Sequence, residues 1–240
     1  MQPFCVSIHS WQIYSWLGRG DDLGRGVMAN VQLAEQFFLI SHDETSGRPL
    51  VSIERVECGL VGAMFGELII DGRLGIKDGL IVVLDKEPVG GGLSDSLVNT
   101  VDQQSTEHPV RTWTRELGPD AYRIMAERLI ASGLLRRERG RKLFSNLGER
   151  YPAVDLYDVA RPRLMLNHVI YNREEIDLTH ALLAALLSTV GVKFILGHDT
   201  NRDELRALVT SLIRAMPGQL QELVAGVDES MASISMTMYR

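Results

Sequence analysis

The stretch ECGLVGAMFGELIIDGRLGIKDGLIVVL, residues 57–84, decides how the rest of this chain folds. Its first half, residues 57–71, predicts a helix with almost no polar face, so nearly all of this helix must be buried. The glycines at positions 59, 62 and 66 each cost roughly 1 kcal/mol relative to alanine inside a helix, so close packing has to compensate for them. We therefore predict that this is the central helix of the hydrophobic core.

The second half of the stretch predicts a β-hairpin. Gly72 follows the last apolar residues of the helix, where glycine commonly ends a helix. Asp78-Gly79 lies between two short apolar runs, and Asp-Gly in that position is the strongest short-range signal for a hairpin turn. Residues 74–84 should therefore fold back on themselves directly after the central helix.

Length and composition restrict the class of protein. A chain of 240 residues that is 45% hydrophobic can form one large domain. Its net charge of −6 argues against non-specific binding to nucleic acid. Two cysteines without metal-ligand spacing indicate a reducing compartment and no disulfide scaffold. The chain lacks an apolar run of about 18 residues and a signal-peptide pattern, so we expect neither a transmembrane span nor secretion.

Helical periodicity on both sides of the central helix predicts a mainly α fold. We expect a single globular helical domain over residues 30–230, with small peripheral β-hairpins, and Asn30 as the cap of its first helix. Gly118-Pro119 should divide two neighbouring helices, because proline disrupts a helix interior. The expected helices, besides the central one, are 30–40, 94–101, 110–117, 120–131, 156–171, 178–196, 203–216 and 219–227.

The two ends of the chain differ from the predicted domain. Residues 1–29 contain an aromatic segment and a glycine-rich linker, and they are either an interfacial membrane anchor, a disordered tail or an over-extended start before Met28. The segment lacks the lysines and arginines usual on the polar face of an anchor, which favours the tail. Residues 231–240 form a C-terminal tail in this prediction, with residues 231–238 as a strand or a frayed end.

Motifs for catalysis are scarce. The sequence contains no HExxH, no GxSxG and no P-loop. Gly90-Gly91-Gly92 follows a predicted strand but lacks GxGxxG spacing, so a structural turn is a better interpretation than a phosphate cradle. We therefore predict that the protein is not an enzyme and needs no cofactor and no metal ion.

Four histidines and one acid are the ionisable groups most open to a chemical role. The His-Asp pairs at positions 42–43 and 198–199 fall in predicted loops, where turn chemistry is the common role. His168 and His180 fall on apolar helices and are expected to be core histidines with hydrogen-bond partners. Glu67 lies in the central helix, and pairing with an arginine or a backbone amide is more common for such a residue than an unpaired buried acid.

The strongest electrostatic feature lies in a second predicted hairpin, residues 134–144 around Gly140. Three interpretations stay open: contact with an anionic bilayer, at about 1 kcal/mol per basic residue near the headgroups; protection of a hairpin edge against stray strand pairing; or self-association. Within seven residues the hairpin has one acid, Glu138, and five cations, which we call the basic cluster: Arg136, Arg137, Arg139, Arg141 and Lys142.

Short matches to one known family recur in order along most of the chain. They are Leu33-Ala34-Glu35-Gln36, Gly59-Leu60, Gly62, Met64, Glu67-Leu68, Gly72-Arg73, Pro88, Gly90, Leu93, Asp95, Val110, Thr112-Trp113, Leu129, Gly133, Leu135, Pro152, Asp177, Thr179 and Leu182-Leu183. In this order and spacing the chain resembles the Golgi phosphoprotein 3 family over residues 33–223. The resemblance implies a helical, non-enzymatic, cytoplasmic protein peripheral to a membrane, which binds phosphatidylinositol 4-phosphate headgroups and cytoplasmic tails of Golgi glycosyltransferases. It also implies self-association through the second hairpin.

The family's headgroup residues have no counterparts here, and we carry over none of them. In place of its tryptophan and three arginines this chain has Ser52, Val61, Pro119 and Tyr122. A headgroup with several negative charges needs charge-assisted donors. Such donors could come from residues beside two helix N-termini that converge in the family fold, since helix N-termini favour anions. The candidates are Arg48, Arg55 and Arg123, and the alternative is that these are ordinary solvated arginines.

Three classes of function remain open for this chain. The first is a peripheral adaptor that binds an anionic phospholipid headgroup or a membrane surface, a protein partner, or a second copy of itself. The second is a winged-helix protein with residues 120–131 as its recognition helix, but acids there balance the arginines, and binding to nucleic acid depends on phosphate neutralisation. We therefore expect no nucleic-acid partner. A hydrolase or transferase with an unrecognised site ranks last.

Overall fold

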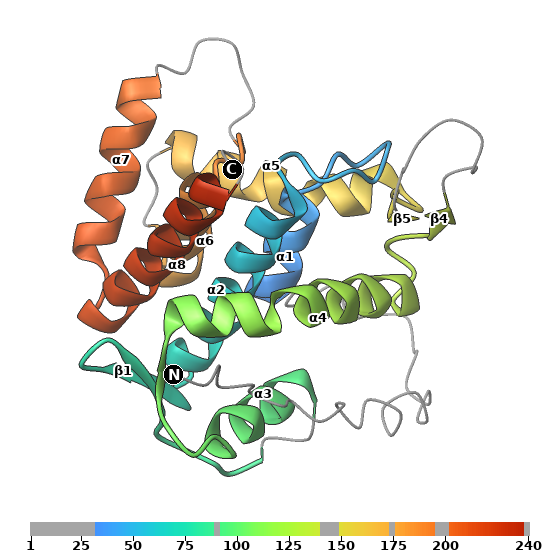
Figure 1. The fold of residues 1–240 in the computed structure, drawn as a ribbon. Helices are drawn as coiled ribbons and strands as arrows, with labels where there is room; N and C mark the ends of the chain where they lie inside the picture. Colours follow the sequence, from blue (N-terminus) through green and yellow to red (C-terminus); the bar gives the residue numbers. More distant parts are fainter. Residues whose placement is uncertain (1–31, 89–91, 140–148, 173–175, 195–201, 238–240) are drawn as a thin grey trace. The chain divides into compact units, whose positions relative to one another are not determined.

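Helix α2, Ile53–Ile70, lies at the centre of the fold (Figure 1). In this computed structural model, residues 32–88, 92–139, 149–172, 176–194 and 202–237 are described. Every residue of α2 from 58 to 66 is buried, and the helix packs against α1, Leu33–Ile40; α4, Val110–Ala131; α6, Leu178–Val190; and α8, Gly218–Thr237. The prediction of a central core helix is confirmed.

The glycines of α2 are the points at which neighbouring helices approach most closely. A Cβ atom at Gly59 would lie 2.2 Å from the nearest side-chain atom, at Gly62 2.8 Å and at Gly66 2.4 Å. The atoms in the way belong to Phe37 of α1, Val227 of α8 and Leu182 of α6. Each glycine thus accommodates a large side chain from a different helix, and the burial of these side chains offsets the cost of glycine in a helix.

The predicted hairpin after α2 is also confirmed. Strands β1, Leu74–Lys77, and β2, Leu80–Val83, pair antiparallel around a two-residue loop. Asp78 and Gly79 both have positive φ, 52° and 76°, as the favoured two-residue hairpin turn requires. A third strand that the sequence did not predict, β3, His108–Pro109, pairs with β2 and completes the sheet order β1-β2-β3.

Three helices match the predictions to within one or two residues, and the bounds of three others differ. The matches are α3, Leu93–Asp102; α5, Leu156–Asn172; and α7, Arg202–Ala215. Helix α1 has Gln32 as its N-cap instead of Asn30, which lies outside the described residues. Helix α6 ends at Val190 because Gly191 takes the left-handed conformation with φ of 86°. Helix α8 continues to Thr237, so the strand or frayed end predicted for residues 231–238 is wrong.

The predicted break at Gly118-Pro119 is wrong, because α4 is a single helix from Val110 to Ala131 (Figure 1). Its buried stripe of Trp113, Leu117, Ala121 and Met125 continues across the proline at intervals of four residues. A Cβ at Gly118 would lie 3.0 Å from the Cβ of Glu57, so this glycine lets α4 pack closely on α2. Packing against α2 therefore outweighs the cost of an interior proline, about 3 kcal/mol.

The second hairpin differs from its prediction in its second strand. Strand β4, Glu138–Arg139, pairs with β5, Glu149–Arg150, which lies beyond the predicted bounds of residues 134–144. Residues 140–148 between them lie outside the described residues. The returning chain is fixed by the turn after α1, because Tyr151 N donates to Gly47 O and Ala153 N donates to Glu44 O.

Residues 32–240 form one compact unit, with a mainly α fold and small β-ribbons as the sequence predicted. The prediction for residues 1–29 concerns residues that the structure does not describe. Within the described ranges, no helix combines the length and apolarity that crossing a membrane requires.

Candidate functional site

The three arginines predicted to bind an anion are placed differently: Arg55 and Arg123 have partners of their own, and Arg48 is exposed. Arg55 on α2 donates from Nη1 to Val190 O at the end of α6, over 3.2 Å. Arg123 on α4 pairs with Asp120, 2.9 Å away, on the exposed side of its own helix. Arg48 is exposed in the turn between α1 and α2. Nothing in these contacts assembles the three into one site.

The second helix N-terminus expected at this site does not exist, because α4 is continuous through residue 120. The remaining one, the start of α2, has Glu54 in its first turn, and this carboxylate is placed to interact with the positive end of the helix. Burial, together with the charge of Glu54, raises the pKa of the neighbouring Glu57 to about 7. The negative charge of Glu54 at this end of α2 therefore opposes the binding of an external anion there.

Two members of the basic cluster are described with their side chains, and both form ion pairs. Arg136 lies 2.9 Å from Glu138, and Arg137 pairs with Glu127 of α4 and lies 3.6 Å from Glu149. Exposed pairs of this kind contribute about 0–1 kcal/mol, so an incoming anion can compete for the arginines. The side chain of Arg139, and all of Arg141 and Lys142, lie outside the described residues.

A hollow of about 460 Å³ lies between the turn after α1 and helix α5. We call it the leucine hollow, because Leu50, Leu156 and Leu164 line it and are each more than 40% exposed. Its other lining residues are Asp43, Glu44, Thr45, Ala160, Arg163 and Lys193, so the formal charges around it balance. The hollow fits an apolar group better than a multiply charged anion.

Arg163 is the buried cation of this hollow, and its donors are already in use. Its Nε lies 2.9 Å from Glu44 Oε1, and Nη2 donates to the carbonyls of Ile40 and His42. Nη1 donates to Lys193 O. The predicted site did not include Arg163, although its place on the same helix face as Val159, Leu166 and Ile170 was the available signal.

His42 is a second residue whose role the sequence did not show. Asp43 behaves as the turn residue predicted, accepting from Ser46 N over 2.7 Å. His42 is buried instead, with Nδ1 2.7 Å from Phe38 O and Nε2 2.8 Å from the hydroxyl of Tyr122. Burial lowers the pKa of His42 to about 4, so the imidazole is neutral at pH 7 and joins α1 to α4.

Glu67 confirms the prediction of a backbone amide partner. Its Oε1 accepts from Ala34 N, 3.1 Å away, in the first turn of α1, and burial raises its pKa to about 7. The prediction of core histidines on helices is wrong for His168, which is exposed. His180 is half-buried and lies 2.8 Å from Asp177 at the start of α6. The pair at 198–199 lies outside the described residues.

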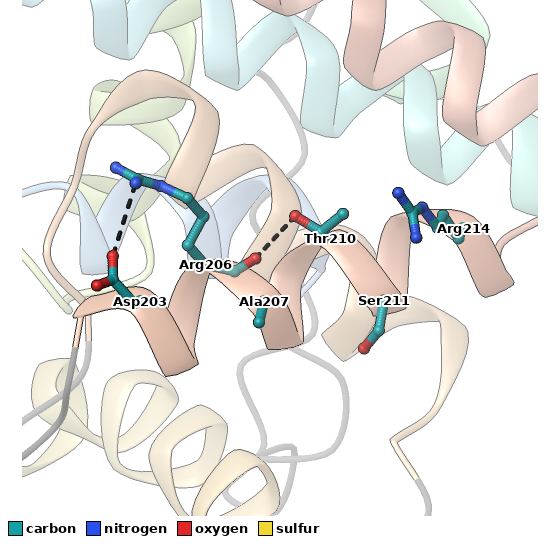
Figure 2. A pocket seen from close by; sticks show the side chains of 6 residues that line it. All are labelled: Asp203, Arg206, Ala207, Thr210, Ser211 and Arg214. Atoms are coloured by element: carbon teal, nitrogen blue, oxygen red, sulfur yellow. Dashed lines mark hydrogen bonds and ion pairs between the residues drawn. The ribbon is translucent and has the colours of Figure 1, made fainter.

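A second hollow, of about 530 Å³, is lined by α7 alone (Figure 2). Figure 2 shows two interactions within the helix: Arg206 lies near Asp203, and Thr210 donates to Arg206 O over 2.8 Å. No other described element contributes a side chain to it, so it lacks the convergent groups of a binding site. Among the described residues, no group of three or more histidines, cysteines or acids is placed to hold a metal ion.

The fold and these surfaces define a class: a mainly α protein with one helical unit, peripheral β-ribbons, and exposed ion pairs and apolar side chains at its surface. The family model of Golgi phosphoprotein 3 (GPP34) matches residues 33–230, and the chain therefore belongs to this family. The resemblance seen in the sequence is confirmed. A comparison with curated proteins found no match.

Proposed function

We propose that this protein is a non-catalytic adaptor that associates with anionic phospholipid at the cytoplasmic surface of a membrane. The observation that supports this most strongly is the match to the Golgi phosphoprotein 3 (GPP34) family over residues 33–230. The ligand in this proposal is a phosphorylated headgroup such as phosphatidylinositol 4-phosphate or another anionic lipid. Binding to partner peptides and self-association through the basic cluster are further parts of the same prediction.

The distribution of charge supports electrostatic contact at one place on the surface. The whole chain has a net charge of −6, so general attraction to an anionic surface is absent. The basic cluster places five cations within seven residues, and each basic residue near the headgroups contributes about 1 kcal/mol. Attraction is therefore expected to come from this cluster and not from the chain as a whole.

A role in binding fits the use that the structure makes of its perturbed ionisable groups. The polar atoms of His42 and Glu67 bond to the backbone or to Tyr122, and both side chains join helices. Burial raises the pKa of the Cys58 thiol to about 11, which leaves it a poor nucleophile at neutral pH. These contacts support a packing role for each group.

The winged-helix alternative required a recognition helix that starts at residue 120. Helix α4 is continuous there, so the helix-turn-helix geometry on which that alternative depended is missing. We therefore keep only the adaptor proposal.

Vesicle co-sedimentation of the full chain tests the proposal. Vesicles of phosphatidylcholine alone are compared with vesicles that also contain phosphatidylserine or phosphatidylinositol 4-phosphate, at low and high salt. We expect binding to the anionic vesicles, and we expect salt to weaken it because ions screen exposed charges. Absence of binding to all three, or equal binding to neutral vesicles, contradicts the proposal.

A further inference from the structure

We propose that the exposed face of α5 lies in the boundary between the headgroups and acyl chains of an anionic bilayer. The face consists of Tyr157, Arg161, Leu164, His168 and Tyr171, which we call the α5 stripe. The inference rests on the proposed function, because it names the surface through which the protein meets the membrane.

Helix α5 is where exposed apolar side chains gather, and three of them, Tyr157, Leu164 and Tyr171, belong to the stripe. Of the ten large apolar side chains that are exposed in the described residues, five belong to α5: Leu156, Tyr157, Leu164, Met165 and Tyr171. Tyr157 is 74% exposed and Tyr171 is 84% exposed. The stripe positions follow one another at intervals of three or four residues, so a helix places them on one side. Large side chains exposed together indicate an interaction surface.

The opposite face of α5 is firmly packed. Val159, Leu166 and Ile170 are buried on that side, where α5 meets α1 and α6. Arg163 fixes the same face through its bonds to Glu44 and to the carbonyls of three other residues. The helix therefore cannot bury its stripe by rotating, and it presents about 25 Å of rigid surface to the outside.

The apolar surface continues beyond the helix into the leucine hollow. Leu50, from the turn after α1, lines this hollow together with Leu156 and Leu164 of α5. Two segments that are distant in the sequence thus form one apolar patch, next to the stripe. A patch broader than one row of a helix can bury more apolar area at a lipid surface. The stabilisation gained is roughly proportional to the apolar area that is buried.

Charge favours a lipid surface as the occupant. The basic residues of the stripe are Arg161 and His168, and Lys193, which lines the leucine hollow, is exposed as well. Of the acids nearby, Glu44 is bound to Arg163, Asp155 accepts from Tyr157 N at the helix start, and Asp158 is half-buried at the edge of the stripe. The five stripe residues themselves thus include the cation Arg161 and no acid, on a chain of net charge −6, and this cation can pair with a lipid phosphate.

The side chains of the stripe are those found at a membrane interface. Tyrosine has an apolar ring and a polar hydroxyl, and it is enriched at the level of the headgroups. The Arg161 side chain can lay its aliphatic stem along apolar surface while its charged group stays among the headgroups. A protein partner with an apolar groove is the competing occupant, and the experiment distinguishes the two.

The first part of the experiment reports the environment of the stripe. In the full chain with Cys5→Ser and Cys58→Ala, Leu164→Cys is labelled with an environment-sensitive fluorophore, and Thr210→Cys on exposed α7 is the matched control. Vesicles of phosphatidylcholine, with and without phosphatidylserine, are then added. We expect a blue shift and a rise in emission for the label at position 164 with anionic vesicles only, and no change at position 210.

The second part measures binding of the unlabelled chain. The triple variant Tyr157→Ser, Leu164→Ser, Tyr171→Ser should lose affinity for anionic vesicles by about tenfold or more, because its apolar contacts with lipid are gone. Its thermal unfolding should match the wild type, since these side chains are exposed. The control variant Ile70→Ser, Leu84→Ser removes exposed apolar side chains elsewhere and should bind as the wild type does.

The outcomes separate the inference from the proposed function. Two results overturn the inference: the wild type binds but the label at position 164 stays in an aqueous environment, or the triple variant binds as well as the wild type. Either result leaves the proposed function in place and points to a protein partner for this face. An equal loss in the control variant also overturns the inference. A wild-type chain that binds no anionic vesicle overturns both. If the triple variant fails to fold, the label at position 164 still decides.

Discussion

At the scale of single residues, Arg163 shows how one side chain can hold several segments together. Its guanidinium bonds to Glu44, and to carbonyls at the end of α1, at His42 and after α6. The planar fork of arginine suits such multiple contacts better than lysine does. Because the group is buried, removal of its partners or of the side chain leaves polar atoms without compensation.

We expect Arg163→Ala to lower the free energy of unfolding by about 3 kcal/mol, because it leaves Glu44 and several carbonyls unpaired in a largely buried place. Urea denaturation measures the change. The neighbouring Arg161 is exposed on the same helix, so Arg161→Ala is a matched control that should change stability by less than about 0.5 kcal/mol. Equal effects of the two substitutions contradict the role given to Arg163.

Glu67 makes stability depend on pH. Its pKa is raised from 4.5 to about 7 in the folded chain, so between these values the folded state binds more protons than the unfolded state. Stability from this group is therefore full below pH 4.5 and falls as pH rises to about 7. Glu67→Gln retains an oxygen for Ala34 N but no charge, and at pH 8 it should be more stable than the wild type by the order of 1 kcal/mol.

The comparison is made by denaturation at pH 8 and at pH 4.5, where the difference between Glu67→Gln and the wild type should vanish. His42 has the opposite dependence, since its pKa is lowered and its contribution is lost as pH falls from 6.5 to about 4. Both proteins contain His42, so the difference between them cancels its effect. A difference that stays constant with pH contradicts the prediction.

At the scale of elements, α2 depends on its glycines for packing. We expect Gly62→Leu to destabilise the protein by about 1–3 kcal/mol, because the new side chain meets Val227 and Leu186, which already lie within about 3 Å of a Cβ there. Gly218 at the start of α8 has no neighbour within 4 Å of a Cβ, so Gly218→Leu is the control and should be close to neutral. Thermal unfolding measures both, and an unchanged Gly62→Leu variant contradicts the packing described.

Helix α4 shows why some elements could be predicted and others could not. The rules for α2 and its hairpin are local: apolar spacing, a terminal glycine and Asp-Gly between strands all lie within residues 57–84. The rule that proline ends a helix is local too, but α4 is held across Pro119 by its contacts with α2. Where tertiary packing competes with a local preference, the sequence alone does not show which prevails.

The candidate site was harder to predict for the same reason. Arg48, Arg55 and Arg123 were chosen for their positions along the chain, yet Arg55 bonds to Val190 at the end of α6, Arg123 pairs with Asp120 on its own helix, and Arg48 is exposed in a turn. His42 and Arg163 bond to residues 80 or more positions away, and the local sequence marks neither as special. The basic cluster was visible because its charges are adjacent in sequence, although the pairing of Arg136 and Arg137 with glutamates was not.

At the scale of the whole molecule, the local concentration of charge matters more than the net charge. We expect Arg141→Glu with Lys142→Glu to weaken binding to anionic vesicles by about tenfold or more, since each basic residue near headgroups contributes about 1 kcal/mol. Arg206→Glu with Arg214→Glu on α7 changes the net charge equally and is the control. Co-sedimentation measures both, and equal losses contradict a special role for the basic cluster.

The contact between Glu67 and Ala34 has a consequence for the order of folding. Helix α1 has eight residues, and its N-cap Gln32 makes no side-chain hydrogen bond, so α1 is too short and too weakly capped to persist alone. The carboxylate that satisfies its first turn comes from α2. Helix α1 should therefore form only after α2 is in place, and substitutions on α1 should speed unfolding while leaving the rate of folding nearly unchanged.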